Sequence, residues 1–309
     1  MSTSDWFEDQ PTLGELPLEQ AATKLREVGE EQAAEQLEEA TTQEAAILGK
    51  GPKKLWPFGG RPWQHTAHAF GYLAPAPPGN DMLPISDAGN IAADETLKNG
   101  RIKITLDRLR VADYPGGSTH RVLFDFYARN QVPGQPEHLH FNATYRVREG
   151  EQAAIRGYPI FVGLNVGGEG VAFKCFTVNV SNDADEAFLG FLESDAFKAG
   201  LQLASTAQPA IGLFSETALG LTKAIAARNR NVPVQDFYLG LDFGSIAMGA
   251  RLAEGSYLAV QVPESLQTVW DWGQWVYSPA QGRVVNKKDP TQLIPYNYLV
   301  FSISRYEGK

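Results

Sequence analysis

The sequence predicts a mainly β protein, with a two-sheet β-sandwich or jelly-roll-like body, a helical insertion and an N-terminal acidic helical arm. From residue 100 onward, short runs of alternating apolar and polar residues are separated by Gly, Pro, Asn and Asp. About eight or nine such runs, with few helices between them, favour a sandwich over a parallel α/β sheet. Acidic residues concentrate before residue 49, which sets an arm apart from the body.

Residues 1–48 form the predicted arm. They hold 12 of the 36 Asp and Glu residues and two of the 27 Lys and Arg residues, so the rest of the chain carries 24 acidic and 25 basic residues. Residues 17–48 are rich in Ala, Glu, Gln and Leu, which favour helix, and Gly29 is expected to divide this helix into two. Leu25 and Leu37 lie in a thin apolar stripe. The stripe fits a helix solvated on the body, an arm that docks a partner or inhibits the body, or a disordered segment.

Residues 49–99 are predicted to form a linker or an extended strap. Gly and Pro recur there at intervals too short for regular structure. Aromatic residues such as Trp63 and Phe70 are costly to leave in water, so we expect parts of the segment to pack on the body. His65 and His68 are expected to form a surface pair.

Residues 100–309 are predicted to form the sandwich domain. The run at residues 101–111 alternates Ile102, Ile104 and Leu106 with polar residues, which is typical of a half-buried strand. Further runs of this kind continue to the end of the chain, among them residues 137–148.

A helical insertion is predicted at about residues 183–230. Asp183 and Glu186 form a capping-box pattern, and Pro209 opens a longer helix whose apolar stripe includes Phe214. We expect this stripe to cover one end or face of the sandwich. The alternative is an amphipathic helix that binds a membrane surface.

His138 and His140 are the candidate metal ligands. Two residues apart on a strand, the two imidazoles lie on one face, which the pattern predicts to be polar and exposed. Arg146 and Arg148 on the same face would repel a cation, which favours an exposed polar strand over a metal site.

The stretch around this pair resembles the first cupin motif, which combines a Gly, an HxH pair, an acidic ligand and a closing Gly. Gly134, His138, His140 and Gly150 match it. The resemblance implies a metal-dependent jelly-roll enzyme. The position of the acidic ligand holds Thr144 or Tyr145, and no His follows residue 140 to supply the second motif.

Asp113, Asp183 and Asp185 are candidate calcium ligands. They lie between predicted strands in a way that is similar to C2 domains, sandwiches that hold Ca²⁺ between aspartate-bearing loops. The resemblance implies hard oxygen ligands, which suit Ca²⁺. Helix capping and turn geometry explain the same aspartates without a metal.

Trp270 and Trp272 are a candidate platform for ligand stacking. In a strand they would share one face, with Trp275 and Tyr277 on the other, and sugars and bases stack on such faces. Burial between the core and the strap is the favoured interpretation. Cys175, the single cysteine, is expected to be a buried, unreactive thiol.

The sequence contains none of the motifs that would name a reaction, such as GxSxG, HExxH or a P-loop. The neutral body has no basic stripe, so no nucleic acid is expected as a partner. Without a signal-peptide pattern or a long apolar run, we expect a soluble, cytoplasmic protein without a cofactor.

We therefore expect a non-enzymatic binding or effector protein. Its arm, residues 1–48, would dock another protein or mask the body. One alternative is a metal-dependent jelly-roll enzyme that uses His138 and His140. A further alternative is a membrane-active effector restrained by the arm.

Overall fold

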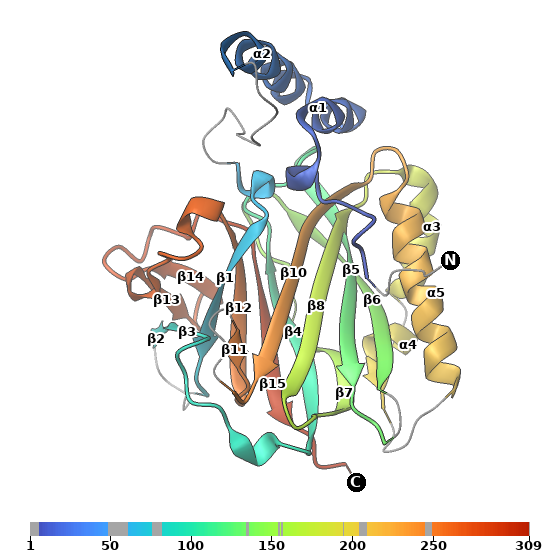
Figure 1. Cartoon of the computed structure of the whole chain (residues 1–309), viewed down its shortest axis with the longest axis vertical. Helices are drawn as coiled ribbons and strands as arrows, with labels where there is room; N and C mark the ends of the chain where they lie inside the picture. Colours follow the sequence, from blue (N-terminus) through green and yellow to red (C-terminus); the bar gives the residue numbers. More distant parts are fainter. Residues whose placement is uncertain are drawn as a thin grey trace.

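Two β-sheets pack face to face in the body, as the sequence predicts, and helices cover part of one outer face (Figure 1). The computed structural model describes residues 6–48, 61–75, 82–133, 136–153, 155, 157–193, 195–203, 209–244 and 249–308. In these residues the strands form sheets of seven, five and three strands.

Most strands that follow one another in the chain are not neighbours in a sheet. The seven-stranded sheet has the order β3 (Ser86–Asp87), β1 (Ala67–Leu73), β12 (Gly255–Val262), β15 (Tyr298–Arg305), β4 (Arg101–Arg110), β7 (Tyr158–Asn165) and β9 (Leu201–Gln202). The five-stranded sheet has the order β11 (Ala250–Arg251), β10 (Val232–Asp242), β8 (Gly170–Asn179), β5 (Thr119–Asn130) and β6 (Glu137–Arg148). The small sheet has the order β14 (Arg283–Asn286), β13 (Trp275–Ser278) and β2 (Leu83–Pro84).

Alternation along the strands separates the core from the outer faces. In β5, Phe124 and Phe126 point into the core between the sheets, where the Phe126 ring lies 6.0 Å from that of Phe301 in β15. The flanking residues Leu123 and Tyr127 point to the outer face, where they belong to a second apolar cluster. This outer face of the five-stranded sheet carries the candidate site.

The helical insertion covers part of that face, as expected from its apolar stripe. It contains α3 (Glu186–Leu192), α4 (Asp195–Lys198) and α5 (Pro209–Ala226). Ile225 of α5 packs against Leu123 and Val178 of the sheet, and Phe214 stacks on Phe141 of β6 at 6.4 Å. In the middle of β6, the polar side chain of Asn142 is buried and bonds Thr222 of α5, so it lies beneath this helix.

The arm forms a helical hairpin of α1 (Leu18–Glu27) and α2 (Glu31–Leu48), which stands at one end of the sandwich (Figure 1). Gly29 ends α1 with a φ of 84°, a left-handed conformation that glycine adopts without strain, so the predicted division is confirmed. Leu25 and Leu37 of the stripe are buried. Before the hairpin, the short helix η1 (Leu13–Glu15) packs on η2 (Pro62–Gln64).

Part of the expected strap is a sheet strand. All seven residues of β1 pair with β12, from Ala67 opposite Val262 to Leu73 opposite Ser256. The expectation of a surface pair for His65 and His68 is wrong, because both side chains are buried. β1 is a short run between two segments rich in Gly and Pro. When residues 49–99 are taken as one segment, this composition hides the pattern of the strand.

The remaining short helices are η3 (Glu95–Leu97), η4 (Asp183–Asp185), η5 (Glu264–Leu266) and η6 (Trp272–Gln274). None of the helices in the described ranges has both the length and the apolar character needed to cross a membrane.

Candidate functional site between the arm and the five-stranded sheet

Trp6 and Phe7, at the start of the described arm, lie on the outer face of the five-stranded sheet. Their side chains are only 6% and 1% exposed. The indole Nε1 of Trp6 donates to both carboxylate oxygens of Asp236 in β10, at 3.1 and 3.3 Å. The Phe7 ring stacks in parallel on Phe176 of β8, with 4.0 Å between the ring centroids. The arm thus begins with two aromatic side chains buried against strands more than 160 residues away in sequence.

A cation and an imidazole also contact the Trp6 indole. The Nζ of Lys174 lies 4.9 Å from the centre of the indole, and 5.7 and 5.8 Å from the rings of Tyr127 and Tyr238. The His140 ring stacks on the indole at 6.1 Å, with 22° between the planes. A cation over the face of an aromatic ring is attracted to its electrons, and rings that lie nearly parallel at this separation pack favourably when they are offset. We call this surface the Trp6–Phe7 seat; it consists of Tyr127, His140, Lys174, Phe176 and Asp236.

Asp236 titrates in an unusual range. Burial raises the pKa of its carboxyl group to about 6, although the indole N–H of Trp6 and the charge of Lys174 both favour the ionised form. Burial also lowers the pKa of Lys174. The seat therefore partly shields a carboxylate and an ammonium group from water.

A buried polar cluster lies next to the seat and fixes His140. Its Nδ1 is 2.7 Å from Oδ1 of Asp125, and Oδ2 of Asp125 accepts from Nδ2 of Asn142 at 3.0 Å. Thr222 of α5 completes the cluster: its hydroxyl accepts from Asn142 at 3.0 Å and donates to Asp125 at 3.3 Å. All four side chains are buried. Because Asp125 holds one ring nitrogen, the orientation of the imidazole beneath Trp6 is set by the sheet itself.

The predicted exposure of this polar strand face is therefore wrong for His140. The arm and α5 cover it, which no local alternation in β6 can indicate. His138 is exposed at the edge, where its Nδ1 lies 2.8 Å from the Tyr127 hydroxyl. Within the described residues, no group of three His, Cys, Asp or Glu side chains is arranged to hold a metal ion.

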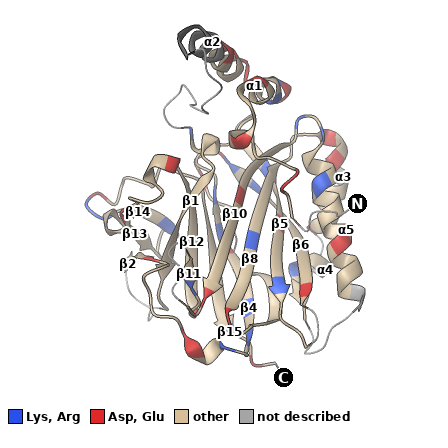
Figure 2. Cartoon of the chain, viewed as in Figure 1, with Lys and Arg blue, Asp and Glu red and all other residues tan. Residues whose placement is uncertain are grey.

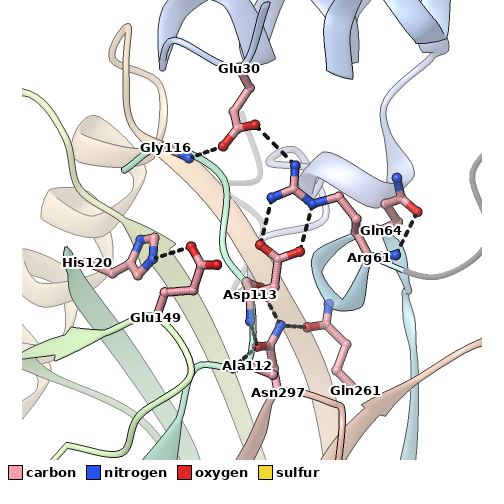
Figure 3. A network of polar contacts seen from close by, with 10 residues as sticks. All are labelled: Glu30, Arg61, Gln64, Ala112, Asp113, Gly116, His120, Glu149, Gln261 and Asn297. Carbon is pink, nitrogen blue, oxygen red and sulfur yellow. Dashed lines mark hydrogen bonds and ion pairs between the residues drawn. The ribbon is translucent and has the colours of Figure 1, made fainter. Parts of the chain in front are cut away.

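A second contact between arm and body is an ion-pair junction centred on Arg61, just before η2 (Figure 3). Its Nε and Nη2 donate to the two oxygens of Asp113 at 2.7 and 2.8 Å, and its Nη1 donates to Glu30 at 3.1 Å. Glu30, between α1 and α2, also accepts from the backbone N–H of Gly116 at 3.1 Å. Asp113 raises the pKa of the Arg61 guanidinium further above its usual value. One arginine thus joins the turn of the hairpin to the loop after β4.

Asn297 holds that loop in place (Figure 3). Its side-chain oxygen accepts from the backbone N–H groups of Ala112 and Asp113, at 2.8 and 3.1 Å. Its amide nitrogen donates to the carbonyl oxygen of Asp113 at 3.1 Å and to Gln261 at 2.9 Å. The carboxylate that meets Arg61 is therefore presented by a fixed backbone.

The three candidate calcium ligands have other partners. Asp113 is bound by the guanidinium of the junction. Asp185 is buried in η4 and pairs with Arg228 and with the amide of Asn231, whereas Asp183 is exposed. Among the described residues these aspartates do not form a cluster that could hold a metal.

The candidate stacking platform is not one strand face. Trp272 lies in η6, is buried and packs on Gly71 of β1, where a Cβ atom would come within 2.9 Å of the indole. Trp270 is partly buried; its ring meets Trp272 at 5.7 Å and stacks parallel to Trp275 at 6.4 Å. The favoured prediction of burial is confirmed for Trp272, but the cover includes β1 of the sheet rather than a strap.

Sequence reasoning missed the Trp6–Phe7 seat. The available signal was an adjacent pair of large aromatic residues in an acidic, otherwise polar segment, outside the apolar stripe of the hairpin. Nothing local distinguishes Lys174 and Asp236 from other charged residues on half-exposed strands.

Comparisons with models of protein families, with curated proteins and with solved structures find no match.

Proposed function

We propose that this protein is a non-enzymatic binding or effector protein, an adaptor whose N-terminal arm both masks the body and docks a protein partner. The observation that carries the proposal is the burial of Trp6 and Phe7 in an apolar part of the outer sheet face that also contains the charged groups of Asp236 and Lys174. The two roles fall to different parts of the arm. Residues 6–9 mask the sheet, and the α1–α2 hairpin is the docking element.

Masking is supported by the chemistry beneath the aromatic pair. A purely structural plug would lie on apolar residues, because burying a carboxylate and an ammonium group costs free energy unless their new partners replace water. Trp6 instead covers Asp236 and Lys174. Polar groups placed around an otherwise apolar recess are characteristic of binding surfaces.

Docking is supported by the acidic residues of the hairpin, whose positions along the ribbon are red in Figure 2. Glu31, Glu35 and Glu39 recur every fourth residue on α2 and are exposed. Glu38 is held by Arg26 of α1, at 2.6 Å. A row of carboxylates on a hairpin that stands away from the sheets fits a partner with a basic surface.

The compartment we propose is the cytoplasm. Cys175 is a free, buried cysteine, and burial raises the pKa of its thiol well above the usual value. A thiol of this kind is unreactive, as expected from the sequence.

The docking role is tested by affinity capture with the full chain as bait. Replacing Glu35 and Glu39 by Lys should abolish capture of the partner, since it reverses two charges of the exposed row. A control with Glu95→Lys and Glu151→Lys makes the same change in net charge on exposed residues of the body and should capture as well as the wild type. An identical set of captured proteins from all three baits would contradict the proposal.

A further inference from the structure

We propose that the Trp6–Phe7 seat is a peptide-recognition site for an adjacent Trp–aromatic pair followed by an acidic residue. Residues 6–9, Trp-Phe-Glu-Asp, are its occupant within the chain, and a segment of the same chemistry in a partner protein is its ligand in trans. This inference rests on the proposed masking function and names what the masked surface recognises.

The first position of the peptide is specific for tryptophan. The indole N–H reaches a carboxylate, Asp236, that is partly buried when the seat is filled. Phenylalanine would fill the ring position and leave that carboxylate without its donor, which is costly for a partly buried charged group. The ammonium of Lys174 over the indole face adds to this preference, because tryptophan binds cations best among the aromatic residues.

Different groups of the protein recognise the second and the fourth residue of the peptide. Phe7 lies flat on Phe176 and meets the edge of the His140 ring, a recess for an aromatic side chain. Lys223 of α5 forms an ion pair with Asp9 at 2.9 Å, and its Nζ lies 5.9 Å from the centre of the Phe7 ring. A lysine therefore selects a carboxylate two residues after the aromatic pair.

The seat is organised by contacts that do not involve its occupant. Asp125 holds His140, and the rings of Tyr127 and Tyr238 both lie within 6 Å of the Lys174 ammonium. A recognition surface fixed in advance loses less conformational freedom when it binds. An incoming peptide would meet the same arrangement that Trp6 meets.

Residues 6–9 can leave the seat while the rest of the arm stays in place. They precede η1, where Leu13 is buried and Gly14 lies so close to Gln64 that a Cβ atom would come within 2.5 Å of the Gln64 carbonyl oxygen. η1 is therefore anchored on η2 independently of Trp6. A short tether of this kind gives the occupant an effective concentration of about a millimolar, which a partner peptide must overcome.

The test uses a fluorescently labelled peptide with the sequence of residues 4–12 and the full-length chain. We expect the peptide to bind the full-length variant Trp6→Ala/Phe7→Ala at least about tenfold more tightly than the wild type, because the tethered occupant no longer competes. Equal binding to both chains, or no binding to a variant whose circular dichroism spectrum matches the wild type, would overturn the inference.

A second variant covers the case in which the double substitution unfolds the chain. Trp6→Phe keeps a ring in the seat and removes only the indole donor, so the peptide should displace this weaker occupant more readily than it displaces the wild-type segment. Two control peptides test specificity: Trp→Phe at the first position and Asp→Asn at the fourth. Both should bind more weakly than the parent peptide, and equal affinity of all three would show that the seat reads neither group.

Light scattering of the wild-type chain separates a partner from a second copy. A dimer that forms with concentration and is lost in Trp6→Ala/Phe7→Ala would assign the seat to another copy of this chain and overturn the partner assignment. The experiments with purified components are independent of the hairpin. If the peptide binds but the hairpin variants capture the same proteins as the wild type, the recognition site stands and the proposed docking function fails.

Discussion

Two contacts between arm and body, the seat and the junction, differ in how they are built. At the seat, Trp6 and Phe7 are almost fully buried, and their contacts are aromatic with charged groups beneath. At the junction, Arg61 is about a third exposed and bridges two carboxylates. Burial of aromatic area stabilises far more than a partly solvated ion pair, so the seat is the stronger of the two contacts and holds residues 6–9 on the sheet. The junction fixes geometry, because a guanidinium that binds a carboxylate through two nitrogens sets direction as well as distance.

The largest effect on the free energy of unfolding should come from the apolar part of the seat. Phe7→Ala should lower the free energy of unfolding by about 3 to 5 kcal/mol, since it removes a fully buried ring that stacks on Phe176. Denaturant unfolding measures the change. Leu213→Ala is the control, because Leu213 is 69% exposed and should cost little. A similar, small loss in both variants would show that Phe7 is not seated in solution.

The next effect is a dependence of the seat on pH. The pKa of Asp236 is about 6 with Trp6 in place and should return toward the usual value near 3.8 when the seat opens to water. A carboxyl group whose pKa is raised in the closed state binds protons more tightly there. The stability that Asp236 gives to the closed seat through this difference in pKa is therefore complete below about pH 4. It is lost as the pH rises to about 6.

Each unit of difference in pKa corresponds to about 1.4 kcal/mol, so the seat should weaken by roughly 1 to 3 kcal/mol over that range. Quenching of Trp6 fluorescence by acrylamide, read against a chain with Trp6→Phe, reports the opening. The other charged groups that act on Lys174 and Asp236 include Glu8 and Glu15. Asp236→Asn should remove the dependence; a profile unchanged by that substitution would assign it to one of the other groups.

A smaller effect is expected from the polar cluster beside the seat. Thr222→Val should cost about 1 to 2 kcal/mol, because Asn142 and Asp125 each lose a buried hydrogen bond. Thr217→Val on the same helix is the matched control: its hydroxyl donates to the Leu213 carbonyl, but the residue is exposed. Thermal unfolding of the two variants should differ. Equal midpoints would mean that the cluster does not orient His140 against Trp6.

Local patterns in the sequence predicted part of the fold, whereas contacts between distant residues could not be predicted. Alternation identified the strands and the mainly β fold, and the stripe of α5 identified a helix that covers the sandwich, because both patterns are local. The burial of His140 and the partner of Trp6 depend on contacts between residues far apart in the chain; Trp6 and Asp236 are separated by 230 residues. A strand whose second face is covered by a distant segment has the same alternation as one exposed to water, so the sequence predicted an exposed face.

The smallest effect, and the one that sharpens the contrast most, should come from the junction. Asp113→Asn removes the charge that Arg61 binds, yet the pair is partly exposed and should contribute only about 0.2 to 1 kcal/mol to unfolding. Added salt screens such a pair, so the difference between Asp113→Asn and the wild type should shrink as the ionic strength rises toward about 1 M, whereas the cost of Phe7→Ala should not. Unfolding of both variants at low and high salt checks this. A loss from Asp113→Asn as large as that from Phe7→Ala, and equally insensitive to salt, would mean that the seat is not the stronger of the two contacts, and the peptide in trans would then have little to displace.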